Sequence, residues 1–201
     1  MLSADQILAR AKAAAKSASS VHLSGTESGT TVDLSVGRNV ATGTVTEGGL
    51  TVALLAVGGT TYVRAGAAFW DSTSGAASAN ALAGKWVVAG SATGGASALV
   101  SFTDIGRVVD QVLAPTGPLT RTPVSTLDGR RVIGVTSSQD GDTLYVALDG
   151  PPYPVRIVPA GGALAGAGSA VAPPTFSAWN APVVVHSPPP DQVVDLSRTG
   201  G

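Results

Sequence analysis

Runs of alternating apolar and polar residues, joined by very short turns, constrain the fold of this chain more than any other feature. Residues 31–36 alternate strictly, which predicts a strand with one buried and one solvated face. Two-residue turns rich in glycine occur at Gly48-Gly49, Gly58-Gly59 and Asp128-Gly129. Because turns this short join only neighbouring antiparallel strands, the sequence predicts a long antiparallel sheet of roughly ten strands built from consecutive hairpins.

Residues 103–113 carry the clearest helical pattern. Thr103 is the expected N-cap, and Pro115 and Gly117 follow the expected end. The large apolar residues recur at helical spacing and share one face: Ile105, Val108, Val109, Val112 and Leu113. The pattern predicts an amphipathic helix that packs its apolar face on the sheet.

A second helix is expected at the N-terminus, where Ser3 and Gln6 have the spacing of a capping box. Its apolar face is mostly alanine over residues 11–18. An alanine face can approach a sheet closely but fills little volume. The sequence therefore predicts an α+β protein of one domain, residues 1–201, in which a long sheet packs on two or three helices that are too slender to fill the space beneath it.

A space left between the sheet and the helices would be a binding site. The expected lining consists of inward residues of the strands, the apolar face of the helix at 103–113, and aromatic residues near the open end of the sheet. The candidates are Val32, Leu34, Val36, Val52, Leu54, Val63, Phe69, Trp86, Phe102, Ile105, Val109, Val112 and Leu113. The alternative is that the same side chains form an ordinary filled core.

The composition excludes several functions. The formal net charge is −1 and the 12 lysines and arginines are scattered, so no basic stripe is available to neutralise nucleic-acid phosphates. Charged residues make up only 12 % of the chain, against about 25 % in typical soluble proteins, as in many exported proteins. The longest apolar run, Val52 to Val57, is too short to span a membrane. The chain has no cysteine, which excludes disulfides and thiol catalysis.

No pattern promises catalysis or metal binding. The chain has two histidines, His22 and His186, with no ligand at metal-site spacing, and it has no G-x-S-x-G motif. The segment Asp140-Gly141-Asp142 lacks the further oxygen ligands of a calcium loop and is interpreted as a hairpin turn. We therefore expect a protein that is not an enzyme and that holds no metal or cofactor.

The order of several short segments resembles a known family. These segments are residues 20–23 (SVHL), 57–63 (VGGTTYV), 127–130 (LDGR), 144–148 (LYVAL) and 176–183 (FSAWNAPV). Together with the two predicted helices they resemble the LppX/LprG/LprA/LprF family of mycobacterial and related actinobacterial lipoproteins, whose fold is similar to that of the carriers LolA and LolB. The resemblance covers most of the chain.

The resemblance implies a half-open antiparallel barrel wrapped over its helices, with a hydrophobic cavity that holds acyl chains of lipids or lipoglycans for carriage or transfer. It also implies export to the cell envelope, at the outer face of the cytoplasmic membrane or in a periplasm-like space. Family members are anchored through a lipidated cysteine near the mature N-terminus, and this sequence contains no such cysteine. The alternative function is a protein-interaction or sensing module of the same fold with a collapsed cavity.

Overall fold

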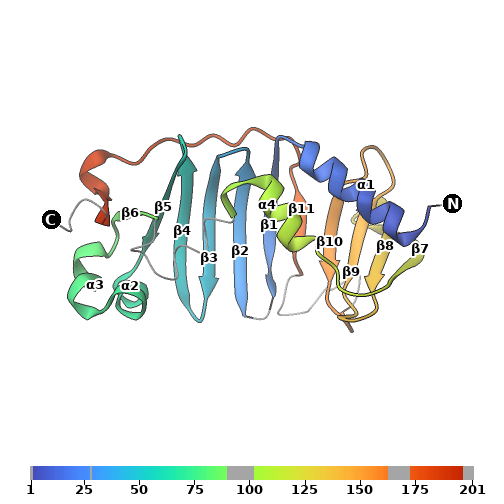
Figure 1. The fold of residues 1–201 in the computed structure, drawn as a ribbon, viewed down its shortest axis with the longest axis horizontal. Coiled ribbons are helices and arrows are strands. Elements are labelled where there is room, and N and C mark those ends of the chain that lie inside the picture. Colours follow the sequence, from blue (N-terminus) through green and yellow to red (C-terminus); the bar gives the residue numbers. More distant parts are fainter. Residues whose placement is uncertain (1, 28, 90–101, 163–172, 197–201) are drawn as a thin grey trace.

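The computed structural model describes residues 2–27, 29–89, 102–162 and 173–196. The chain forms one long open sheet of 12 strands, in the order β12-β6-β5-β4-β3-β2-β1-β11-β10-β9-β8-β7 (Figure 1). The edge strands β12 and β7 lie at opposite ends of this sheet, which is therefore not closed into a barrel. All pairs are antiparallel except β12 with β6. The α+β class and the long antiparallel sheet are confirmed.

The sheet consists of two meanders, β1–β6 and β7–β10, which the short strand β11 joins by lying between β1 and β10. The strands are β1 Ser20–Glu27, β2 Thr30–Gly37, β3 Ala41–Glu47, β4 Leu50–Val57, β5 Thr60–Ala65, β6 Trp86–Val88, β7 Leu119–Leu127, β8 Arg130–Ser137, β9 Thr143–Ala147, β10 Pro154–Val158, β11 Thr175–Ser177 and β12 Val193–Val194.

Helices α1 (Ala4–Ser17) and α4 (Ile105–Val112) lie over the same face of the sheet, which we call the inner face (Figure 1). Helix α1 contacts β7, β8 and β10, whereas α4 crosses in front of β1 and β2. The short helices α2 (Ala67–Ser74) and α3 (Ala76–Leu82) lie at the other end, beside β4 to β6. The 3-10 turn η2 (Pro190–Gln192) precedes β12.

The capping box predicted for α1 is confirmed. The backbone N–H of Gln6 donates to Ser3 Oγ over 3.2 Å, and the N–H of Ser3 donates to Gln6 Oε1 over 3.0 Å. The two bonds satisfy donors that a helix start otherwise leaves without a partner. The buried face that follows is Ala4, Ile7, Ala11 and Ala15, three of them alanine.

Side chains of the inner face form continuous rows across the first meander. Direct cross-strand partners run from Leu34 through Gly43, Leu54 and Val63 to Val87. Gly43 is required in this row because a Cβ there would lie 2.0 Å from the Asp33 carbonyl oxygen, and its φ is +146°. The row and the buried residues of α4 belong to the same apolar cluster, which also includes inner-face residues of the second meander.

Candidate functional site

The predicted lining residues beneath α4 meet as a tightly packed core. Leu34, Val36 and Val63 are 0 % exposed, and Leu54 is 1 % exposed. Ile105, Val109 and Leu113 of the helical segment are each 2 % exposed, and Val52 is 5 % exposed. Leu34, Val36 and Val63 have no accessible surface and therefore adjoin no space that water could enter, so the interior around them is filled in this structure. Ligand binding by them stays a prediction.

Four more candidates lie at the margin of this core. Val32, Phe69, Phe102 and Val112 are partly buried and pack against the same apolar cluster. They are therefore part of the predicted region, although they are less enclosed than the residues beneath α4.

Trp86, which the sequence predicts as an aromatic lining residue near the open end of the sheet, does not lie on the inner face with the other candidates. It is the direct cross-strand partner of Arg64, whereas the neighbouring Val87 is the partner of the buried Val63. Because consecutive residues of a strand point to opposite faces, Trp86 lies on the outer face. There the Arg64 guanidinium lies 4.7 Å from the centre of the indole ring, a cation–π contact.

The space between the end of α4 and strands β8 to β10 is small. The pocket there has a volume of about 80 Å³, and Leu8, Val112 and Leu113 are among its lining residues. Asp140 lies at its polar side, where its carboxylate accepts hydrogen bonds from Ser137 Oγ and Thr116 Oγ1, each over 2.5 Å. These bonds hold the pKa of Asp140 below its ordinary value, because they stabilise the charged form.

A larger apolar pocket lies between the N-terminal half of α1 and strands β7 to β9; we call it the α1 pocket. Its volume is about 390 Å³. Its lining is mainly apolar and comes from α1, three strands and the turn after β9: Leu2, Ile7, Arg10, Arg121, Val124, Ile133, Val146, Ala147, Leu148, Gly150 and Pro152. Ile7 is the residue of the buried face of α1 that enters this lining, whereas the buried alanines Ala11 and Ala15 are 0 % exposed and do not line the pocket.

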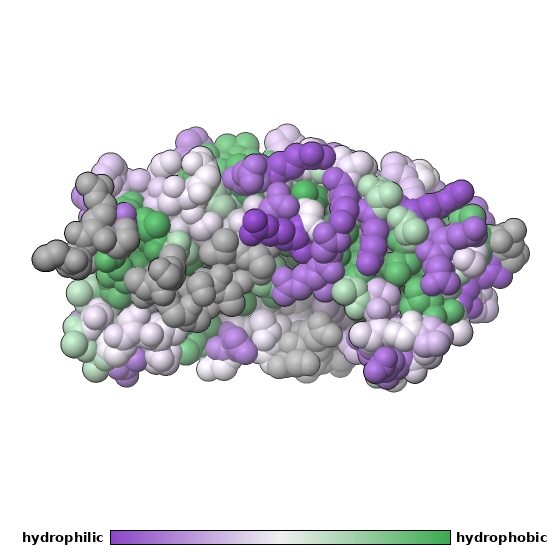
Figure 2. Space-filling model, viewed as in Figure 1, coloured by the Kyte–Doolittle hydropathy of each residue, from purple (hydrophilic) through white to green (hydrophobic). Residues whose placement is uncertain are grey.

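Two lining residues expose large apolar surface. Val124 is 53 % exposed and Leu148 is 38 % exposed, and the only other large apolar side chain of comparable exposure among the described residues is Val184. In Figure 2, apolar atoms gather beside α1 over β8 and β9, with hydrophilic atoms around them. The structure thus keeps an apolar surface open at this end of the molecule.

Strand register explains why the second meander presents this surface. Val124 is the direct partner of the inward Ile133, and Arg121 is the partner of the inward Val135. Both therefore lie on the inner face. Residues three apart in a regular strand point to opposite faces, but a bulge between Arg121 and Val124 adds one residue and places both on the same face. Strand β7 is an edge strand, so its inner-face side chains have a neighbouring strand on one side only.

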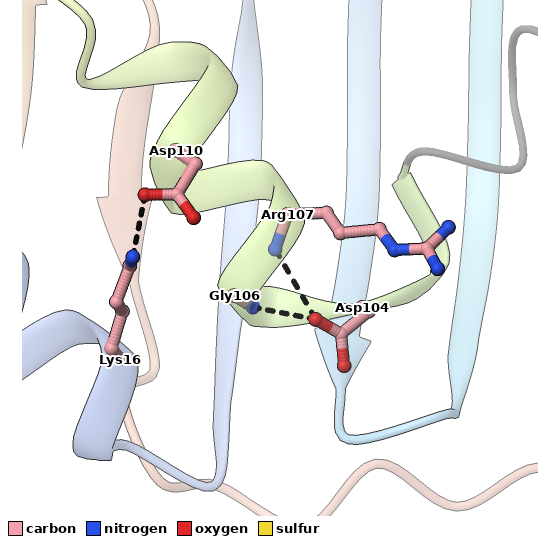
Figure 3. Close-up of polar contacts among 5 residues, drawn as sticks. All are labelled: Lys16, Asp104, Gly106, Arg107 and Asp110. Carbon is pink, nitrogen blue, oxygen red and sulfur yellow. Dashed lines mark hydrogen bonds and ion pairs between the residues drawn. The ribbon is translucent and has the colours of Figure 1, made fainter.

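The pocket at the start of α4 has a different character. Its volume is about 400 Å³ and its lining is mostly polar: Asn39, Ala56, Gly59, Thr60, Thr61, Thr103, Asp104 and Arg107. The N-cap of α4 is Asp104 rather than the predicted Thr103, because the Asp104 carboxylate accepts from the N–H groups of Gly106 and Arg107 over 2.9 and 3.2 Å (Figure 3). A polar lining of this kind does not suit an acyl chain.

The histidines and acidic residues are the candidate metal ligands in the part of the chain that the structure describes. No group of three or more histidine, cysteine, aspartate or glutamate residues is found there that could hold a metal ion. His22 lies on β1 with Nδ1 3.1 Å from Ser35 Oγ and Nε2 3.6 Å from an Asp33 oxygen. No described helix combines the length and the apolar character needed to cross a membrane.

These features define a class of fold: one long open antiparallel sheet with helices packed on one face. The crystal structure of LprF from Mycobacterium bovis has this fold. It superposes with a TM-score of 0.56, covering 92 % of this chain and 96 % of that chain at 18 % sequence identity. The fold implied by the resemblance to the LppX/LprF family is thereby confirmed, and at this identity the likeness concerns the fold alone.

Sequence comparisons add nothing further. No family model matches the chain, and no curated protein matches it.

Proposed function

We propose that this protein is a non-catalytic lipid-binding protein of the cell envelope that holds an acyl chain in the α1 pocket. One observation carries the proposal: a concave, mainly apolar pocket of about 390 Å³ whose mouth includes the exposed Val124 and Leu148. Pockets that bind small molecules typically measure about 300–1,000 Å³. The fold is shared with LprF, and the resemblance of the sequence to the LppX/LprF family implies the envelope location and the carriage of lipids.

Burial of apolar surface would drive binding. Each methylene that moves from water into an apolar site gains about 0.8 kcal/mol, so a long acyl chain gains of order 10 kcal/mol before the cost of ordering it. The head group would remain at the mouth, where the arginines of the pocket meet solvent. Release to a membrane or to another carrier requires no covalent step.

Native mass spectrometry of protein purified from an actinobacterial host, combined with titration of a fluorescent fatty acid, tests this proposal. We expect one bound acyl chain per protein. Leu148→Gln should weaken probe binding by about tenfold or more, since a loss of about 1.4 kcal/mol corresponds to a factor of ten. Val184→Gln is the matched control, because Val184 is 73 % exposed and does not line the pocket. Finding neither bound lipid nor probe uptake would refute the proposal.

The second candidate function is an envelope module that binds a protein partner through the same fold. The complete burial of Leu34, Val36 and Val63 favours it, because the interior beneath α4 is already filled. The two candidates predict opposite results for the fluorescent fatty acid. Probe binding that Leu148→Gln weakens supports the lipid carrier, whereas a folded protein that takes up no probe supports the interaction module.

A further inference from the structure

The α1 pocket combines an apolar interior with two arginines. Arg10 enters its lining from α1, and Arg121 enters from β7. Both residues are exposed, and the structure shows no hydrogen bond or ion pair of either side chain with any residue that it describes. The lining contains no aspartate or glutamate. The local charge is therefore positive, in a chain whose formal net charge is −1.

From this charge pattern we propose that the α1 pocket selects a single-chain anionic amphiphile, with Arg10 and Arg121 binding its carboxylate or phosphate head group. The inference rests on the proposed function and adds the class of ligand. Guanidinium groups bind carboxylate and phosphate through two parallel hydrogen bonds between opposite charges. A neutral glycerol head group has no negative charge to pair with them. A mainly apolar pocket near the lower end of the usual size range suits one chain.

The position of Arg121 fits this role. Its cross-strand partner Val135 is 3 % exposed and faces inward, so Arg121 starts from the same inner face as Val124, on the edge strand. The aliphatic stem of an arginine can cover apolar surface while its charged end stays in water. Arg121 can therefore border the acyl chain and meet the head group with the same side chain.

Two other arginines of the second meander are already paired. Arg156 donates to Asp128 over 2.9 Å, and Arg131 lies 3.6 Å from Asp149. Arg130 is exposed and shows no ion pair among the described residues. Its cross-strand partner Leu127 packs on the outer face, so Arg130 also lies on that face. Arg130 therefore serves as a matched control, with the same charge on the same meander but away from the α1 pocket.

Isothermal titration with three palmitoyl probes below their micelle concentrations tests the inference. The probes are palmitate, palmitoyl lysophosphatidate and monopalmitoylglycerol, which share the chain and differ in the head group. We expect at least one anionic probe to bind about tenfold more tightly than the neutral probe at low salt, and the preference to shrink as salt rises. Whichever of the two anionic probes binds with the higher affinity identifies the preferred head group as carboxylate or phosphate.

The double variant Arg10→Gln/Arg121→Gln should remove this preference and leave the affinity for monopalmitoylglycerol unchanged. Arg130→Gln should retain the preference. Equal binding of neutral and anionic probes to the natural protein would overturn the inference while leaving the lipid-binding function intact, and so would a preference that survives in the double variant. Failure of all three probes to bind would instead refute the proposed function, and the inference with it.

Discussion

The interior beneath α4 and the interior beneath α1 belong to the same sheet, yet one is filled and the other is open. The buried residues of α4 are Ile105, Val108 and Val109, which meet inward side chains that are 0–2 % exposed, such as Leu34. The α1 pocket of about 390 Å³ lies beside the N-terminal half of α1, where Ile7 is the buried residue of the helix that lines it. On the other side of this pocket lies the edge strand β7, whose Val124 is 53 % exposed, so the space remains near the edge of the sheet.

The largest expected effect on the free energy of unfolding comes from removing side-chain volume in the filled region beneath α4. Leu34→Ala should lower the free energy of unfolding by about 2–5 kcal/mol, because Leu34 is 0 % exposed and its loss leaves a cavity. Leu148→Ala should cost below about 1 kcal/mol, since Leu148 is 38 % exposed. Urea denaturation of both variants measures the difference. Equal losses of stability would contradict the distinction between the two regions.

The next largest effect on the free energy of unfolding comes from adding side-chain volume to the buried face of α1. Ala11 is 0 % exposed, so Ala11→Leu must displace the neighbours of the helix and should cost about 1–3 kcal/mol of unfolding free energy. Ala13→Leu is the control, because Ala13 is exposed on the same helix. Thermal unfolding followed by circular dichroism compares the two. A stabilised Ala11→Leu variant would show that the open space reaches the middle of α1.

Much of the fold could be predicted because it depends on local patterns. The short turns at Gly58-Gly59 and Asp128-Gly129 produced the hairpins β4–β5 and β7–β8 as expected. The pairing of β11 with β1 could not be predicted, because it joins residues such as Leu23 and Phe176 that are far apart in the sequence. Three-residue strands carry too little pattern to identify such partners.

The sequence predicts a space between the sheet and its slender helices, with the apolar face of the helix at 103–113 in the lining, and the structure has an apolar pocket of about 390 Å³ beside α1. The alanine face of α1 was visible in the sequence, whereas the residues beneath α1 depend on the tertiary arrangement. The Val124 side chain stays exposed because β7 is an edge strand. The bulge after Arg121 places this side chain on the inner face. Leu148 could have been found, since it continues the inward alternation of Leu144 and Val146.

A smaller effect, confined to acid pH, is expected where the two regions meet. Hydrogen bonds from Ser137 and Thr116 lower the pKa of Asp140 from its ordinary value of 3.8. A carboxylate with a lowered folded-state pKa contributes stability that is fully present above the unfolded value and is lost as the pH falls through the folded value. Acidification should therefore destabilise the natural protein more than Asp140→Asn.

Melting temperatures of the two proteins at neutral pH and below pH 3.8 measure this effect. Asp142→Asn is a control on the same turn, because the Asp142 carboxylate accepts a single hydrogen bond, from the N–H of Ala160 over 3.1 Å. Identical acid sensitivity of the natural protein and Asp140→Asn would contradict the prediction.

The smallest effect is expected for the ion pair that links the two helices. Lys16 of α1 and Asp110 of α4 approach to 2.5 Å, but their side chains are 45 % and 62 % exposed (Figure 3). An exposed pair gains little because water screens it, so a double-mutant cycle with Lys16→Ala and Asp110→Ala should give a coupling of about 0.2–1 kcal/mol. The coupling should fall towards zero in about 1 M salt, where screening acts within about 3 Å.

A second cycle with Lys12→Ala in place of Lys16→Ala is the control, because Lys12 lies on α1 and the structure shows no ion pair between it and Asp110. This cycle should show no coupling. If instead the Lys16–Asp110 coupling exceeded the expected range and persisted in high salt, the two helices would be joined by their charges. The contact between the filled and the open region would then depend on that link. A small, salt-sensitive coupling would instead show that the apolar contacts of the two helices with the sheet hold them in place.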